Sequence, residues 1–260
     1  MAQKLDAEVD YFDAGIDTVD FSLILLKREL DVAIARYKWD KAEEMLEQLK
    51  AGLEKEGTLQ SPRNQMGLKP EEYCIRYNQK KCSAEEFMAV CEQLAECENE
   101  RWREEAYWKQ FLTRDKVRIL NYIAVLYTIR REFDKAANIW EEVLGWLEKS
   151  SVGLTERYSE SLTTLSNLAI TYNKMKCNEK SIQMSEKSIQ FCLECGRGAT
   201  IPKLIANQVE ALIVSVDDTA ECKMQLRQAY YIGKLFRNHV CKSINEHYVG
   251  HFGVDVEGDK

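Results

Sequence analysis

Two short stretches of this chain carry nearly the same residues at the same place between two helical patterns. In residues 37–42 Trp39 is followed by Asp, Lys and Ala42, and in residues 131–136 Phe133 is followed by Asp, Lys and Ala136. An aromatic at a helix–helix turn fills the gap between the paired helices, and the small residue after it lets their backbones approach closely. A motif that recurs in this way predicts an array of helical hairpins.

Apolar residues around the motifs recur with the period of a helix. The stripe Leu120, Ile123, Ala124 and Tyr127 returns one unit later as Leu165, Leu168, Ala169 and Tyr172. Spacings of three, four and seven residues place such side chains on one helix face. The pattern predicts helical hairpins over residues 19–55, 116–149, 157–196 and 200–238, with a final helix near residue 248.

The sequence therefore predicts an all-α fold. We expect a right-handed superhelical stack of about five tetratricopeptide-like hairpins, that is, an α-solenoid with units longer than the standard repeat. Residues 1–18 are expected to be a lead-in, 19–252 the repeat domain and 253–260 a flexible tail. The stretch 57–70, with two glycines and two prolines, is expected to be a long loop. Ser83 and Glu86 have the spacing of a capping box that begins a helix.

The two turn aromatics are expected to be structural. If Trp39 and Phe133 each fill the space between paired helices, truncation to Ala should cost about 3–5 kcal/mol. The motif also predicts that the small residues behind them, Ala42 and Ala136, lie in close helix–helix contacts.

The charge balance argues against some partners. The formal net charge is -7 and the sequence pI is about 5.3, so this chain carries no electrostatic footprint for nucleic acid or an anionic membrane. No apolar run approaches the roughly 20 residues that span a bilayer, and the first residues show no apolar signal region. Nine cysteines without a framework of spacings suggest reduced thiols, and together these features predict a cytoplasmic protein.

Candidate metal and catalytic residues are few. Cys192 and Cys195 form one Cys-x-x-Cys pair, but a structural zinc needs four ligands and no second pair exists. His247 and His251 are spaced to share a helix face, without a His-Glu-x-x-His pattern. The sequence contains no phosphate-binding loop and no nucleophile elbow. We therefore expect no metal, no cofactor and no enzyme activity.

Four stretches together resemble a known family. They are residues 118–127, 165–172, 228–236 and the ending 247–253, and the similarity runs from about residue 20 to 253. In this order they are similar to the C-terminal sensor region of Xre-like transcription regulators of Gram-positive bacteria, the quorum-sensing type with tetratricopeptide bodies. The resemblance implies a peptide or protein ligand in the concave groove of the repeats. It also implies a DNA-binding helix-turn-helix head, and about 18 residues before the first repeat are too few for one.

Polar residues on the first helices of the hairpins are the predicted binding surface. Asparagine amides offer a donor and an acceptor to a peptide backbone, and the resemblance implies that such asparagines hold an extended peptide. Asn167 and Asn207 occupy equivalent positions, two residues before Ala169 and Val209. The predicted peptide-binding residues are Arg118, Asn121, Tyr122, Asn167, Asn207 and Glu210, with Lys27, Arg28 and Asp31 as weaker members.

Two functions stay open at this stage. The chain is either the ligand-sensing body of a transcription regulator, which contacts DNA only through a head absent from these residues, or a free-standing helical-repeat adaptor that binds another protein. Both interpretations expect no membrane contact, and both leave homodimerisation open. The natural reading frame upstream of Met1 would distinguish them, because a helix-turn-helix there indicates the regulator.

Overall fold

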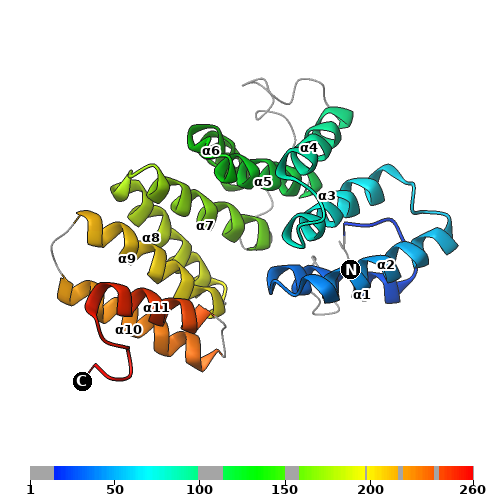
Figure 1. Ribbon diagram of the computed structural model, residues 1–260. Helices are drawn as coiled ribbons and strands as arrows, with labels where there is room; N and C mark the ends of the chain where they lie inside the picture. Colours follow the sequence, from blue (N-terminus) through cyan, green and yellow to red (C-terminus); the bar gives the residue numbers. More distant parts are fainter. Residues whose placement is uncertain are drawn as a thin grey trace. The chain divides into compact units, whose positions relative to one another are not determined.

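The computed structural model describes residues 15–98, 114–149, 158–196, 198–215, 219–236 and 240–259. These residues form helices joined by short turns, with no strand among them (Figure 1). The all-α prediction is confirmed. The helices are α1 (Phe21–Ala35), α2 (Trp39–Glu56), α3 (Pro62–Asn78), α4 (Ala84–Glu98), α5 (Arg114–Ile129), α6 (Phe133–Lys149), α7 (Tyr158–Lys174), α8 (Asn178–Glu194), the short 3-10 helix η4 (Gly198–Thr200), α9 (Ile201–Ser215), α10 (Thr219–Leu235) and α11 (Val240–Phe252).

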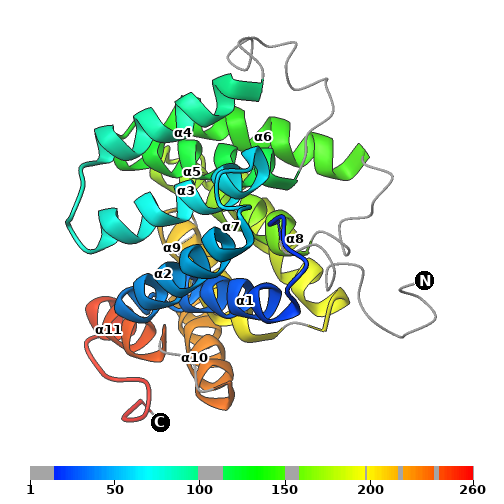
Figure 2. The same ribbon diagram turned by 90° about the vertical axis from the view of Figure 1, so that its right-hand side faces the viewer.

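The chain divides into two compact units, residues 1–126 and 127–260, and each is described by itself. In unit 1, α1 packs on α2, α2 on α3 and α3 on α4. In unit 2, each helix from α6 to α11 packs on the next, and α9 also contacts α7 and α11 directly (Figures 1 and 2). Contact between every second helix is what a stack of helical hairpins requires, because the first helix of each hairpin lies beside the first helix of the next. The number of repeats and the handedness of the stack remain predictions, as does the lead-in, of which residues 1–14 lie outside the described residues.

Four helix–helix turns share one backbone geometry. Tyr37, Lys80, Arg131 and Lys176 each have φ between 56° and 62°. In each turn the N–H of this residue donates to the carbonyl three residues earlier, and the next N–H donates to the carbonyl five residues earlier, as with Lys176 to Asn173 and Cys177 to Tyr172. These bonds satisfy the last carbonyls of the helix. The repeat is therefore visible in the backbone even where the sequence motif has disappeared.

The two turn aromatics lie where the motif places them, but they are only half-buried. Ala42 and Ala136 are fully buried, as close helix packing requires. Trp39 packs against the core of unit 1 from its edge and contacts the ring of Tyr37. Phe133 is likewise half-buried. Because both side chains keep part of their surface in water, we lower the expected cost of truncation to about 1–2 kcal/mol. Among the tryptophans that the structure describes, Trp140 is the one that is fully buried.

The expected long loop over residues 57–70 is wrong. Only residues 57–61 connect two helices, and α3 begins at Pro62 behind the N-cap Ser61, whose side chain accepts from the N–H of Asn64. Proline suits the first helical position because its missing N–H would be unpaired there anyway. Pro70 lies inside α3 and is buried. The capping box that begins α4 is confirmed by both of its hydrogen bonds, between Ser83 and Glu86.

Gly67, inside the expected loop, lies in α3 and allows close packing there. A Cβ at this position would lie 2.6 Å from the carbonyl oxygen of Gly15. Asn64, one turn earlier and fully buried, exchanges hydrogen bonds with the backbone of Asp17: its Oδ1 accepts at 2.7 Å and its Nδ2 donates at 3.1 Å. The residues before α1 are therefore docked onto α3, and the glycine allows that close approach.

The expected flexible tail is instead packed. Val256 is fully buried in the core of unit 2, and its N–H donates to Asn245 Oδ1 at 2.9 Å. Glu257 accepts from Tyr230 and Lys234 on α10, and Asp259 pairs with Lys223 at 2.6 Å. The tail and α11 thus cover the apolar end of the last hairpin together.

No helix in the described parts of the chain is long and apolar enough to cross a membrane.

Candidate functional site

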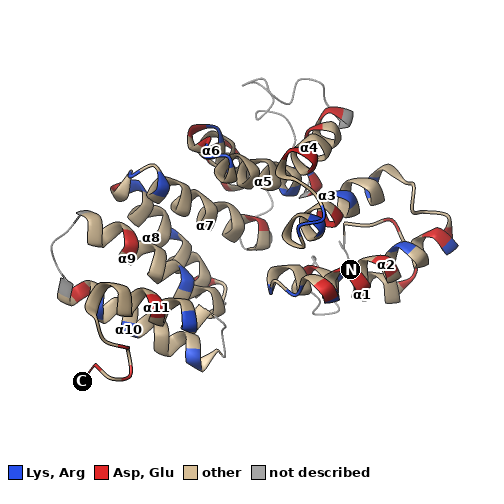
Figure 3. Cartoon of the chain, viewed as in Figure 1, with Lys and Arg blue, Asp and Glu red and all other residues tan. Residues whose placement is uncertain are grey.

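The first helices of unit 1 bring four charged side chains together. Lys27 and Asp31 are one turn apart on α1, Glu71 lies on α3 and Arg118 on α5. Lys27 Nζ lies 2.5 Å from Asp31 Oδ1 and 2.9 Å from Glu71 Oε1. Arg118 reaches Glu71 Oε1 at 3.1 Å and Asp31 Oδ2 at 3.9 Å. We call these four residues the charge cluster of unit 1; both signs of charge are visible on α1 and α3 in Figure 3.

Burial sets the electrostatics of this cluster. The Lys27 side chain is fully buried and that of Glu71 is 2% exposed, whereas Arg118 and Asp31 keep 20% and 38% of their surface. Burial raises the pKa of Glu71 to about 7, against the attraction of Lys27 and Arg118. Burial acts in the same direction on Asp31, but Lys27 and Arg118 outweigh it and lower the pKa of that carboxyl. Glu71 Oε2 is buried and has no hydrogen-bond partner among the described residues.

The predicted peptide-binding residues on the first helices of unit 1 lie in different surroundings. Arg118 belongs to the charge cluster, together with Asp31. Asn121 is only 7% exposed and is a core residue. Tyr122 is half-buried, packs against the ring of Phe87 at 5.4 Å, and has a pKa well above its usual range because its hydroxyl is buried. We therefore leave Asn121 and Tyr122 out of the binding surface proposed below. Arg28 lies on α1 outside the cluster, half-buried.

The first helices of unit 2 carry a row of polar side chains without such a cluster. Asn173 on α7 donates to Glu210 Oε2 on α9 at 3.1 Å. His247 on α11 places Nε2 3.8 Å from Glu210 Oε1. Burial lowers the pKa of His247, His251 adds to this, and Glu210 opposes it. We call Asn173, Glu210 and His247, which are in contact, together with Asn167 six residues before Asn173 on α7, the polar row of unit 2.

The two equivalent asparagines differ in what they bond. Asn207 donates from Nδ2 to Ser185 Oγ on α8 at 3.0 Å, and Ser185 is fully buried. Its amide therefore connects two hairpins. Asn167 is half-buried, and its amide has no hydrogen bond to any described residue; only its backbone carbonyl is used, by Thr171. The residue of α6 at the position that Ser185 holds in α8 is Trp140, which offers no hydroxyl group.

Sequence reasoning missed Asn173. It considered His247 only as a candidate metal ligand and not as a neighbour of Glu210. Asn173 follows Tyr172 at the end of a predicted apolar stripe, and its partner Glu210 was already among the predicted residues. His247 and His251 meet edge to face, with their ring centroids 4.6 Å apart. Cys192 is buried and Cys195 caps the end of α8. Among the described residues, no three metal-ligating side chains gather in one place.

Comparisons with known proteins bear on the fold. No protein-family model matches this chain, and no curated protein matches it by sequence. The structure is similar to Bacillus thuringiensis PlcR in complex with the peptide PapR7 and DNA, with a TM-score of 0.72 and 18% identity over 95% of this chain and 81% of that one. PlcR in its apo form matches with a TM-score of 0.67 and 17% identity, over 89% of this chain and 78% of that one. The TPR-like repeats of a putative kinesin light chain from Podosopora anserina match with a TM-score of 0.51 and 17% identity, over 81% of this chain and 94% of that one.

These likenesses show the fold, a tetratricopeptide-like helical repeat. The Xre-like regulator family stays a prediction.

Proposed function

We propose that this chain is a peptide-binding helical-repeat module, and that its role is the peptide-sensing body of a transcription regulator. The fold likeness to PlcR, which was solved with a peptide and DNA, supports this reading. So does the polar row of unit 2, in which three successive first helices present side chains that can bond a peptide backbone.

The observation that carries the proposal is the Asn167 amide. It is half-buried, lies on a first helix, and has no hydrogen bond to any described residue. A peptide backbone would offer it both an acceptor and a donor, which is the pairing an asparagine amide needs. Glu210 and Asn173, already bonded to each other at 3.1 Å, would read the ligand's side chains or its amino terminus.

The test is a screen of short synthetic peptides, drawn from small reading frames of the source genome, by thermal shift of the purified chain. A peptide that binds should lose about tenfold or more in affinity in Asn167→Ala, which corresponds to about 1.4 kcal/mol. The matched control is Asn138→Ala, an exposed asparagine of α6 in the same unit, which should bind as the parent does. Equal binding by Asn167→Ala and the control would remove the assigned site.

The alternative is a free-standing adaptor, and the likeness to TPR-like kinesin light chain repeats favours it. An adaptor would bind a protein segment without any response in DNA binding. The natural reading frame upstream of Met1 separates the two: a helix-turn-helix encoded there supports the regulator, and its absence supports the adaptor.

A further inference from the structure

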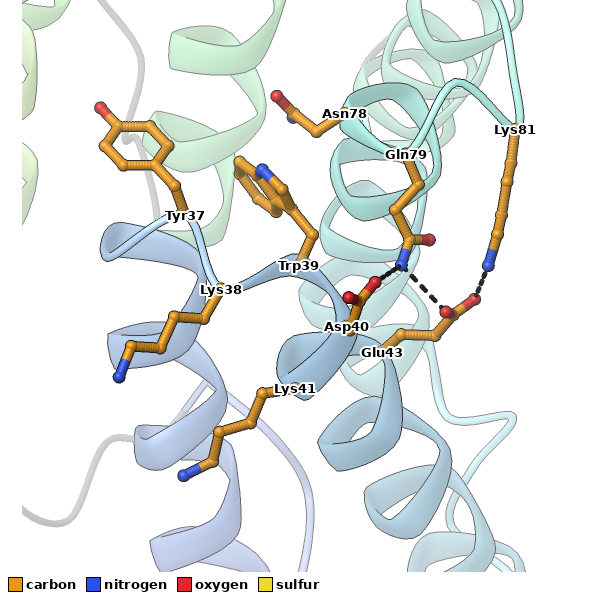
Figure 4. Close-up of a pocket in the computed structure, with 9 residues that line it drawn as sticks. All are labelled: Tyr37, Lys38, Trp39, Asp40, Lys41, Glu43, Asn78, Gln79 and Lys81. Carbon is orange, nitrogen blue, oxygen red and sulfur yellow. Dashed lines mark hydrogen bonds and ion pairs between the residues drawn. The ribbon is translucent and has the colours of Figure 1, made fainter.

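The turn between α1 and α2 carries a second surface, which shares no residue with the polar row. Two hollows adjoin it and share Lys38 and Lys41. One, of about 610 Å³, is lined by Tyr37, Trp39 and the α3–α4 turn (Figure 4). The other, of about 390 Å³, lies between α1 and α2 and is lined by Arg36, Val32 and Met45, among others. Both lie in unit 1.

The acidic residues of the first hollow are already paired. Gln79 Nε2 donates to Asp40 Oδ1 at 3.1 Å and to Glu43 Oε2 at 3.0 Å. Lys81 Nζ lies 2.5 Å from Glu43 Oε1. Figure 4 shows Gln79 and Lys81 directed at these carboxylates from the α3–α4 turn. Lys81 therefore balances the charge of Glu43, whereas Asp40 accepts only from a neutral amide.

The basic residues at the α1–α2 turn are not matched. Arg36, Lys38 and Lys41 are exposed, and none of them has an ion pair or side-chain hydrogen bond with a described residue. Figure 4 shows the amines of Lys38 and Lys41 on the same side, directed away from Gln79 and Lys81. One acid, Glu29, lines the second hollow with them. These three cations outnumber the two acids beside them, Glu29 and Asp40, in a chain of net charge -7.

The turn geometry does not require the exposed tyrosine beside these cations. Tyr37 is 55% exposed although its backbone is left-handed, with φ 56°. The three equivalent turns carry Lys80, Arg131 and Lys176 at this position, so the geometry does not call for an aromatic. The ring centroids of Tyr37 and Trp39 are 5.8 Å apart, and the angle between the ring planes is 70°. Tyr37, Trp39 and Arg36 belong to the residue types that are enriched where proteins bind partners.

The C-terminal tail shows how this chain holds an acidic segment elsewhere. Glu257 accepts from the Tyr230 hydroxyl at 3.0 Å and pairs with Lys234 at 2.5 Å. Val256 beside it is buried among apolar side chains. The α1–α2 turn presents the same three elements, a tyrosine, lysines and the apolar surface of Val32 and Met45.

We propose that the α1–α2 turn binds an acidic peptide segment of a partner protein, with carboxylates on Arg36, Lys38 and Lys41 and an apolar or aromatic side chain against Tyr37 and Trp39. A nucleic acid fits less well, because a long polyanion would also meet Glu29 and the net negative charge of the chain. This site shares no residue with the polar row of unit 2.

The test uses a fluorescein-labelled synthetic peptide, Glu-Glu-Asp-Leu-Phe-Glu-Asp-Glu, and its anisotropy on titration with the purified chain. Saturable binding that weakens with added salt is expected, because the contacts are exposed charges. The double variant K38E/K41E should bind about tenfold more weakly or worse. The control K55E/K203E makes the same change of charge at exposed lysines outside both hollows and should lose much less.

A second variant separates the aromatic contact from charge. Tyr37→Gly removes the ring and relieves the left-handed backbone, so it should fold at least as well as the parent while binding the peptide several-fold more weakly. Asn167→Ala should bind it unchanged, which keeps this result independent of the proposed function. Equal binding by K38E/K41E and its control would overturn the proposal. Binding of labelled duplex DNA that exceeds the peptide and is lost in K38E/K41E would replace it with a nucleic-acid site.

Discussion

The first helices of the two units occupy equivalent places in their hairpins but use their polar residues differently. In unit 1, Lys27, Glu71 and their partners form a charge cluster that is largely buried. In unit 2, Asn173 and Glu210 share a single hydrogen bond. The Asn167 amide has no hydrogen bond among the described residues. The same surface of a repeat can thus hold helices together or remain open to a ligand.

The difference follows from the cost of burying charge. Lys27 at 0% exposure is stable only with its carboxylate partners, since an unpaired buried charge is strongly unfavourable. A cluster of this kind fixes the spacing of α1, α3 and α5, and little of it is accessible. The neutral amides of Asn167 and Asn173 carry no such cost, so in the proposed function they would exchange their contacts for those of a peptide.

The largest expected effect is on the charge cluster. Lys27→Met leaves Glu71 and Asp31 without their buried cation and should destabilise unit 1 by about 3–5 kcal/mol. Lys50→Met is the control, because Lys50 pairs with Glu47 and Glu72 at the surface and should cost at most about 1 kcal/mol. Urea unfolding gives the size of the effect, and hydrogen exchange shows whether it is confined to unit 1. A similar loss of unfolding free energy in both variants would mean that the buried charge cluster stabilises unit 1 no more than a surface ion pair does.

Glu71 should make the stability of unit 1 depend on pH. Its pKa rises from an ordinary 4.5 to about 7 on folding, so its favourable contribution is complete below about pH 4.5 and is lost as the pH rises through 7. The loss is on the order of 2–3 kcal/mol. Glu71→Gln should remove it, so the difference in unfolding free energy between the two proteins should change between pH 5 and pH 8 in favour of the variant. A difference that is constant over that range would show that Glu71 is ionised throughout.

The two equivalent asparagines of unit 2 should separate by stability. Asn207→Ala leaves the buried Ser185 hydroxyl without its donor and should cost about 1 kcal/mol or somewhat more. Asn167→Ala breaks no side-chain hydrogen bond to the described residues and should be within about 0.5 kcal/mol of the parent. Thermal unfolding of both variants without peptide measures this. If Asn167→Ala is the more destabilised of the two, Asn167 is structural and the polar row loses its principal binding residue.

Much of the fold could be predicted because helix periodicity is a local signal. The hairpins at 19–55, 157–196 and 200–238 match α1–α2, α7–α8 and α9–α10 closely. The failure at α3 has a physical cause: Gly67 and Pro70 resemble loop residues, and only the approach of Gly15 to Gly67 explains why a glycine is needed in that helix. Tail packing was missed for the same reason, because Val256 finds its partners in residues distant in the chain.

The candidate site was less predictable than the fold. Sequence spacing places Asn167 and Asn207 at equivalent positions, but it cannot show that the amide of Asn207 bonds Ser185 while that of Asn167 bonds no described residue. The charge cluster was visible only in part, as Lys27, Asp31 and Arg118 on predicted first helices. Glu71, which joins them, lies in the stretch adjoining the predicted loop, so its burial could not be anticipated.

The smallest effect tests whether the turns of the two units are truly equivalent. Lys80 in unit 1 and Lys176 in unit 2 both have φ 60°, a conformation that glycine adopts without the strain of a Cβ. Lys80→Gly and Lys176→Gly should therefore each stabilise the protein, by about 0.5–1 kcal/mol after the larger entropy of glycine in the unfolded chain is deducted. Asn138→Gly, at an exposed position inside α6, should instead destabilise by up to about 1 kcal/mol. Urea midpoints of the three variants decide the matter. If one variant is more stable than the parent and the other less stable, the two turns differ in backbone strain although they share a hydrogen-bond pattern. The turns of the two units would then not be equivalent.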